Sequence, residues 1–207
     1  MKKNVLIVFV KNIKLGKVKT RLAKTIGNKA AFEIYKALVK ITEKATKDIP
    51  VATHIYFSDT IVHTKWQDKF KTVQKGNDLG ERMKNAFEDG FKKGYKNIIL
   101  IGSDLPEISS KTILQGFTSL SRTDTVFGKA ADGGYYLIGL SKMNAPIFEN
   151  KPWSTTQLLD VTLQELQNNH QTVSLLPTLN DIDTFEDLIA SDFYKKNIYI
   201  QKLCTIR

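Results

Sequence analysis

Short apolar runs alternate with longer amphipathic stretches along the first half of the chain. Three runs rich in Val, Ile or Phe and bounded by polar residues or Gly indicate buried strands: Asn4–Val10, Val51–Ser58 and Asn97–Gly102. Apolar residues at three- and four-residue steps predict amphipathic helices over 31–45 and 79–91. Strands and helices that alternate with connections of this length are typical of right-handed crossovers on a mostly parallel sheet. The expected fold class is therefore α/β.

The pattern changes in the second half. Two strand-like runs, Thr125–Ala130 and Tyr135–Leu140, are separated only by a short turn that contains Asp132, Gly133 and Gly134. Such a turn is too short for a parallel crossover, so the two strands must be antiparallel if they are adjacent, and the sheet must be mixed. The remaining pattern predicts a helix that Ser109 caps, a helix over 155–168, a strand over 172–176 and a helix over 184–193.

Length and composition favour an ordinary globular protein. The 207 residues, of which 42% are hydrophobic and 25% charged, fit one domain over 1–207. No apolar run approaches the roughly 18 residues that span a bilayer, and Val5–Val10 is too short for a signal peptide. A single cysteine, Cys204, cannot form an internal disulfide. We therefore expect a cytoplasmic protein without a membrane span.

The net charge of +10, from 31 Lys and Arg against 21 Asp and Glu, raises the alternative of a nucleic-acid binder. The lysines are spread along the chain, however, and no aromatic residues are interleaved with them as stacking platforms. Nucleic acid is therefore an unlikely partner.

A basic loop follows the first predicted strand. It reads K-N-I-K-L-G-K-V-K-T-R and contains one glycine, Gly16, among five cations: Lys11, Lys14, Lys17, Lys19 and Arg21. Ligands of open α/β sheets bind beyond the carboxyl ends of the strands, where Lys and Arg can pair with phosphate oxygens. The spacing is not that of a Walker A loop. The alternative is a solvated basic loop.

Two further segments could hold a metal. Gly102-Ser103-Asp104-Leu105-Pro106 delivers one carboxylate at the end of a buried strand, and Mg²⁺ often takes only one or two carboxylates beside phosphates. The alternative for Asp104 is a turn residue before a proline. In Asn180-Asp181-Ile182-Asp183-Thr184, the aspartates could simply favour a helix start, since Thr184 and Asp187 have capping-box spacing. Asp183 alone is taken as a metal candidate.

Two loops rich in Gly and Asp remain. The first, over 74–82, is our hypothesis for base recognition, through Gln74, Gly76, Asp78 and Gly80. The second, Asp132-Gly133-Gly134 with Trp153-Ser154-Thr155 further on, is our hypothesis for acceptor binding. Each could also be ordinary loop punctuation. The three histidines are scattered and receive no role.

In this order, the motifs resemble those of the GT-A-like nucleotide-diphospho-sugar transferase superfamily. The resemblance is greatest to the bacterial radical-SAM/selenodomain-associated transferase branch, which is related to 2-phospholactate guanylyltransferase. It rests on F-V-K-x-x-x-x-G-x-V-K-T-R-L over 9–22, on D-L-G-E-R over 78–82, and on the segments around Asp104, Asp132 and Trp153. The resemblance implies a Rossmann-like, mostly parallel sheet with helices on both faces, a nucleotide over its first half and an acceptor over its second.

Carried over by position, the resemblance assigns the phosphates to Lys11, Lys17, Lys19 and Arg21, and Mg²⁺ or Mn²⁺ to Asp104 and Asp183. The chain departs from two neighbours. Glycosyltransferases of this superfamily usually show Asp-x-Asp, whereas Gly102 stands in place of the first aspartate. Molybdenum-cofactor guanylyltransferases have a glycine-rich first loop, whereas this loop is rich in lysine.

The leading hypothesis is nucleotidyl transfer from a nucleoside triphosphate to a small phosphorylated acceptor, with Lys19, Arg21 and Asp104 in catalytic roles. The dense basic loop favours it, because a triphosphate carries more charge than a sugar nucleotide. The alternatives are glycosyl transfer from a nucleotide sugar, with Asp132 orienting the acceptor, and a non-catalytic nucleotide-binding protein. The sequence carries no signal for the base, the sugar or the oligomeric state.

Overall fold

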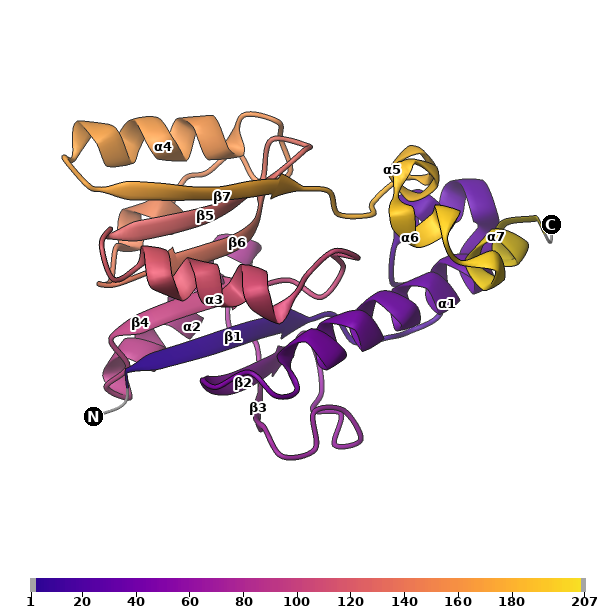
Figure 1. Ribbon diagram of the computed structural model, residues 1–207, viewed down its shortest axis with the longest axis horizontal. Helices are drawn as coiled ribbons and strands as arrows, with labels where there is room; N and C mark the ends of the chain where they lie inside the picture. The colour runs from indigo at the N-terminus through magenta and orange to yellow at the C-terminus, as the bar shows by residue number, and fades with distance from the viewer. Residues whose placement is uncertain (1–2, 206–207) are drawn as a thin grey trace.

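The structure, a computed structural model, describes residues 3–205. Its strands are β1 (Asn4–Val10), β2 (Ala52–Phe57), β3 (Phe70–Val73), β4 (Asn97–Ile101), β5 (Thr125–Ala130), β6 (Tyr135–Leu140) and β7 (Val173–Leu179). Its helices are α1 (Thr20–Thr46), α2 (Leu79–Lys92), α3 (Ser110–Ser119), the 3₁₀ helix η1 (Ala145–Phe148), α4 (Leu158–Asn168), α5 (Phe185–Ala190), α6 (Asp192–Lys195) and α7 (Ile198–Thr205). Figure 1 shows the arrangement.

One mixed sheet organises the chain, in the order β3-β2-β1-β4-β6-β5-β7. Of the seven strands described, only β6 runs antiparallel to its neighbours, β4 and β5. The α/β class and the antiparallel pair that the short turn predicted are therefore confirmed. The carboxyl ends of β1, β4 and β7 meet at one edge, which is where ligands of such sheets bind.

Helices cover both faces of the sheet, because the central strands are apolar on both sides. Within β1, Leu6 and Val8 belong to a core shared with α1 and α3. The alternate residues Val5 and Ile7 belong to a second core with α2, η1 and α4. This three-layer arrangement makes β1 and β4 a rigid base for the loops that follow them.

A third, smaller core joins the two ends of the chain. Helix α1 is interrupted at Gly27, whose φ of 83° and ψ of 160° are not helical. The short segment before this break packs Leu22 against Ile182 and Leu188. Figure 1 shows α5, α6 and α7, in yellow, beside the start of α1. The segment between β7 and α5 is thereby held next to the loop that follows β1.

The structure corrects several predicted boundaries and adds elements. The helix expected over 184–193 is two helices, because Ser191 adopts an extended conformation and caps α6. The helix expected from 155 begins at Leu158, and the last strand continues to Leu179. The sequence pattern did not predict β3, η1 or α7. Within residues 3–205, no helix combines the length and apolar character that a membrane crossing requires.

Candidate metal and nucleotide site

Lys19 lies at the centre of the site. It precedes α1 with φ 46° and ψ 49°, a left-handed conformation that is uncommon outside glycine and is often found at functional sites. Its side chain is only 5% exposed. The ammonium donates to Asp104 Oδ2 at 2.9 Å and to Asp183 Oδ1 at 2.7 Å. The basic loop thus places one buried cation between two carboxylates that are distant in the sequence.

The loop after β4 presents Asp104. Its neighbour Ser103 is buried, and its hydroxyl lies 3.0 Å from the hydroxyl of Tyr35. The Tyr35 oxygen accepts from the Lys11 N–H at 3.1 Å and donates to the Lys11 carbonyl at 3.2 Å. A Cβ at Gly102 would lie 2.9 Å from Asp104 Oδ1. Glycine at position 102 therefore leaves room for this carboxylate, where an Asp-x-Asp motif would place a side chain.

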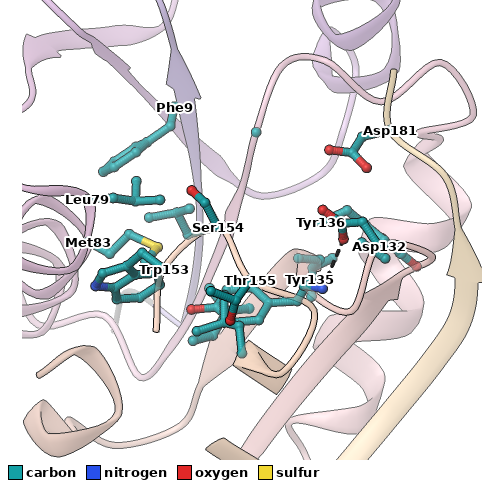
Figure 2. A pocket seen from close by; sticks show the side chains of 17 residues that line it. Phe9, Leu79, Met83, Asp132, Tyr135, Tyr136, Trp153, Ser154, Thr155 and Asp181 are labelled. Carbon is teal, nitrogen blue, oxygen red and sulfur yellow. Dashed lines mark hydrogen bonds between the residues drawn. The ribbon is translucent and has the colours of Figure 1, made fainter. Parts of the chain in front are cut away.

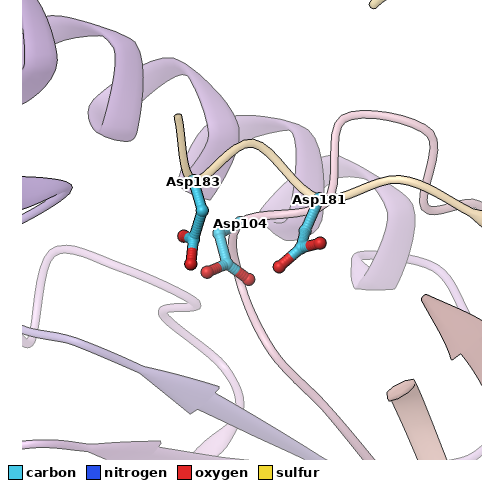
Figure 3. A group of neighbouring side chains, drawn as sticks. All are labelled: Asp104, Asp181 and Asp183. Carbon is cyan, nitrogen blue, oxygen red and sulfur yellow. The ribbon is translucent and has the colours of Figure 1, made fainter. Parts of the chain in front are cut away.

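Asp181 and Asp183 reach the same place from the segment after β7. Between them, Ile182 is fully buried in the third core and anchors the segment. The capping box of α5 adds to this, since Asp187 Oδ2 accepts from the backbone N–H groups of Asp183 and Thr184 at 3.1 and 2.7 Å. Figure 3 shows Asp181 and Asp183 on either side of Asp104. One oxygen of each carboxylate lies within 4.8 Å of the others.

The charges of the cluster shift its pKa values. Burial alone would lower the pKa of Lys19, but Asp104 and Asp183 outweigh it and hold that pKa well above its ordinary range. Burial would raise the pKa of Asp183, but Lys19 and Arg21 hold it below its usual value. Burial and the charges of Asp104 and Asp183 raise the pKa of Asp181 to about 6. The cluster therefore carries a surplus of negative charge near Asp181.

This donor set fits a divalent cation. Hard ions such as Mg²⁺ and Mn²⁺ prefer oxygen ligands, and three carboxylate oxygens here lie close enough to share one ion. Burial first, and then the charges of Asp104 and Asp183, raise the pKa of Asp181, and a bound cation would oppose both effects. Residues of this cluster could thus hold a metal.

A pocket opens beside the cluster, with a cavity of about 220 Å³. In Figure 2, Phe9, Leu79, Met83 and Trp153 lie on one side of it, and Asp132, Tyr136 and Asp181 lie on the other. Asp181 belongs both to the pocket and to the cluster of three aspartates. The two sites are therefore adjacent.

The structure brings the predicted acceptor residues together. Asp132, Gly134, Trp153, Ser154 and Thr155 all line this pocket. The turn of Gly133 supports it: this residue has φ 89°, and a Cβ here would lie 2.1 Å from the Thr156 carbonyl oxygen. Their role as acceptor-binding residues stays a prediction.

The predicted phosphate-binding residues of the basic loop are not gathered around one cavity as the predicted acceptor residues are. Arg21 is exposed, with one nitrogen 3.4 Å from Asp183 Oδ2. Lys11 and Lys17 are exposed on the same loop, in which Gly16 has φ 73°. Their assignment to phosphate, like that of Gly16, stays a prediction.

The loop before α2 already has structural contacts. The Gln74 amide donates to the Tyr56 carbonyl at 2.9 Å, Asp78 caps α2, and the Gly76 carbonyl accepts from Arg82. A Cβ at Gly80 would lie 2.3 Å from the Phe148 carbonyl oxygen. A base-recognition role for this loop remains a prediction.

Asp181 is the functional candidate that sequence reasoning missed. As the first acidic residue of an Asp-Ile-Asp segment before a helix, it resembles an ordinary helix start. The available signal was the apolar residue between the two acids. An apolar side chain buried at Ile182 makes it natural for both flanking carboxylates to lie on the opposite side.

The chain was compared with known proteins. The model of a family described as uncharacterized proteins conserved in bacteria (DUF2064) matches residues 38–155, which is more than half of the chain. No curated protein matches the sequence. A crystal structure of a candidate nucleotide-diphospho-sugar transferase from Desulfovibrio desulfuricans G20 is 30% identical, with a TM-score of 0.87, over 98% of this chain and 94% of that chain.

More distant structures show the fold alone. The structure of CMP:2-keto-3-deoxy-manno-octonic acid synthetase complexed with CTP is 13% identical, with a TM-score of 0.55, over 91% of this chain and 96% of that chain. The manganese complex of Rv0371C from Mycobacterium tuberculosis H37Rv is also 13% identical, with a TM-score of 0.54, over 91% and 97%. The expectation of a nucleotide-diphospho-sugar transferase fold is thus confirmed, and the chain belongs to the family of uncharacterized proteins conserved in bacteria (DUF2064).

Proposed function

We propose that this protein is a metal-dependent transferase that uses a nucleotide donor, and that its reaction is nucleotidyl transfer from a nucleoside triphosphate. The observation that carries the proposal is the cluster of three carboxylates around the buried ammonium of Lys19. It lies at the sheet edge where this fold binds its ligands. The manganese and CTP complexes of proteins with the same fold support both ligand classes.

In the proposed mechanism, the acidic residues bind the metal and the basic residues bind the phosphates. Asp104, Asp181 and Asp183 would hold a divalent cation, which when bound neutralises phosphate oxygens. Lys19 and Arg21 supply positive charge beside it, where the leaving group develops negative charge. The exposed Lys11 and Lys17 extend this charge along the loop toward the outer phosphates. Catalysis by such a site comes from positioning and charge neutralisation rather than from a covalent intermediate.

In the proposed reaction, a nucleophilic atom of the acceptor attacks the α-phosphorus of the triphosphate. A bond forms between that atom and phosphorus, the bond to the β-phosphate bridging oxygen breaks, and pyrophosphate leaves with the bonding electrons. The acceptor's proton passes to solvent or to Asp132, the carboxylate of the pocket that lies outside the aspartate cluster.

Glycosyl transfer is the second candidate, because the 30% identical relative is named as a candidate nucleotide-diphospho-sugar transferase. In that reaction the acceptor attacks the anomeric carbon, and a nucleoside diphosphate leaves. The same cations would stabilise the leaving group, and Asp132 would orient the acceptor hydroxyl. The two reactions differ in which phosphate-containing product is released.

Melting temperatures with a panel of nucleoside triphosphates and nucleotide sugars, with and without Mn²⁺, test the proposal. A ligand that binds the native state raises the melting temperature by mass action. We expect Mn²⁺-dependent stabilisation by one triphosphate, followed by pyrophosphate release when an acceptor is supplied, and loss of both in Asp104→Asn. A response to nucleotide sugars alone would make the protein a glycosyltransferase. Stabilisation by a nucleotide without product from any acceptor would leave the non-catalytic hypothesis, and no response to any nucleotide would contradict the proposal.

A further inference from the structure

We propose that the pocket beside the three aspartates binds an acceptor with an apolar, ring-sized body and a hydroxyl or ammonium head group, and not a phosphorylated compound. The inference rests on the proposed function only in calling this molecule the acceptor. The binding preference itself follows from the walls of the pocket and can be measured without a nucleotide.

The body of the ligand is specified by an apolar wall. Phe9 extends from β1, Leu79 and Met83 extend from the first turns of α2, and Trp153 closes the wall from the segment before α4. Aromatic and aliphatic side chains of this kind bind apolar molecules by excluding water and by stacking on rings. A cavity of about 150 Å³ lined by apolar residues accepts benzene, and this one measures about 220 Å³. It therefore has room for a single ring and a short substituent.

The charge of the ligand is specified by the opposite wall. Asp132 and Asp181 contribute carboxylates, and none of the described residues that line the pocket is Lys, Arg or His. Without a metal at the cluster, a phosphate in this cavity would meet two like charges and no protein cation, which is unfavourable in a partly desolvated site. Asp132 lies outside the cluster and would keep its charge when Asp181 holds a metal. The basic loop does not supply such a cation, because none of its residues lines the cavity. A hydroxyl or an ammonium can instead donate to these carboxylates.

Tyr135 brings a second polar group to the wall of the pocket. It lines the pocket, and its hydroxyl oxygen is buried without a hydrogen-bond partner in the described part of the chain. A buried hydroxyl that lacks a partner is costly, and such groups in native structures usually have a functional reason. Its ring is held against Phe127, with 5.1 Å between centroids, so the hydroxyl is fixed in place. This oxygen is closed to solvent, so a ligand would reach it only if side chains of the pocket wall moved aside.

This ligand class differs from the phosphorylated acceptor expected from the sequence. The basic loop favoured a triphosphate donor, and none of its residues lines this pocket. Within the described residues, the lysine-rich and apolar sides of the sheet edge are separated by the cluster of aspartates. Donor and acceptor are thus distinguished by charge.

Three probes that share one body test the proposal: 2-phenylethanol, 2-phenylethylamine and 2-phenylethyl phosphate. Each is titrated into the full chain by ligand-observed NMR, with EDTA and without a nucleotide. We expect the alcohol and the amine to bind at least about tenfold more tightly than the phosphate. Trp153→Ala should weaken the binding of 2-phenylethanol by about tenfold, and Tyr135→Phe should weaken it several-fold. Tyr199→Phe, at an exposed tyrosine, should not change this affinity.

A second test adds a positive charge at an exposed position of the pocket, where the substitution should not disturb folding. Leu79 lines the pocket but is 48% exposed, so Leu79→Lys should fold and should bring the phosphate to equal or better affinity than the amine. Binding of the phosphate to the unchanged protein as tightly as the alcohol, or no binding of any of the three probes, would overturn the proposal. Nucleotide binding with Mn²⁺ is measured separately. Failure to bind a nucleotide would therefore not affect the result for the pocket, and failure of the pocket to bind the three probes would not affect the result for the nucleotide.

Discussion

At the scale of single residues, Lys19 is the most unusual residue of the site, because it combines a left-handed backbone with a buried ammonium. Each of these two features costs free energy. Among the cations of the basic loop that the structure describes, only Lys19 has either of them. Strain of this kind persists where the surroundings fix it, and here Asp104 and Asp183 do so. These two features are the reason that we propose a role in catalysis for Lys19 and not only a place at the start of a helix.

Replacing this ammonium should abolish most activity while leaving the fold. We expect Lys19→Met to lower the rate of nucleotide transfer about 100-fold or more, because the departing phosphate loses its buried counter-charge. Initial rates and urea denaturation check this, with Lys92→Met, at an exposed lysine on α2, as the control. Full activity in Lys19→Met would remove this residue from the mechanism.

At the scale of elements, the turn between β5 and β6 shapes the pocket beside the three aspartates. Gly133 has φ 89°, and a side chain here would meet the backbone of Thr156. Gly94 offers a matched comparison, because it has φ 85° but no atom within 4 Å of a Cβ. The two glycines therefore separate backbone strain from steric conflict.

Gly94→Ala should cost about 1 kcal/mol of unfolding free energy, since strain alone is added. Gly133→Ala should cost clearly more, about 2–4 kcal/mol, and should also weaken binding of 2-phenylethanol. Urea denaturation of both variants measures the difference. Equal losses in the two variants would mean that the turn relaxes without disturbing the pocket.

Asp124 should make the stability of the sheet depend on pH. Asp124 joins the starts of β5 and β7: its Oδ2 accepts from the backbone N–H of Thr172 at 3.0 Å, and Lys142 lies 2.9 Å from Oδ1. Hydrogen bonds from Thr172, together with Lys142, lower the pKa of Asp124 to about 2. A lowered pKa means that the stabilisation is complete above the unfolded value of 3.8 and is lost as the pH falls toward 2.

Asp124→Asn should therefore lower the unfolding free energy by about 1 kcal/mol at pH 7, since solvent screens these contacts, and the difference from the unchanged protein should shrink below about pH 4. Denaturation at a series of pH values measures it, with the exposed Asp68→Asn as the control. A difference that stays constant down to pH 3 would mean that the charge of Asp124 contributes nothing.

At the scale of the whole molecule, the site joins segments from opposite ends of the chain. Lys19 and Asp183 are 164 residues apart, and the small core under α5 and α7 holds them together. Ile182 belongs to that core and separates the two C-terminal aspartates. Stability of this core and metal affinity should therefore change together.

Ile182→Ala tests that coupling. It should lower the unfolding free energy by about 2–4 kcal/mol and should also weaken Mn²⁺ binding, because the aspartate segment loses its anchor. Leu166→Ala, in the core beneath α4, removes a similarly buried side chain and should cost similar stability without changing Mn²⁺ affinity. Equal Mn²⁺ affinities in the two variants would contradict the anchoring role.

Much of the fold was predictable, because buried parallel strands and amphipathic helices leave strong periodic signals. β3 was not, since its four residues form a partly exposed edge strand with little apolar pattern. Lys19, Asp104 and Asp183 were predicted as site residues, and the structure brings them together. Asp181 left only the weak local signal of Ile182 between two acids. The apolar character of the pocket depends on how distant segments pack, which no local pattern records.

Mn²⁺ binding, followed by the loss of the electron paramagnetic resonance signal of the free ion, tests the central claim most directly. We predict that the unchanged protein binds one Mn²⁺, more tightly with its triphosphate, and that Asp104→Asn, Asp181→Asn and Asp183→Asn each weaken binding by about tenfold or more. Asp192→Asn, at an exposed helix residue, should bind like the unchanged protein. Absence of Mn²⁺ binding, or binding that survives all three substitutions, would contradict the account.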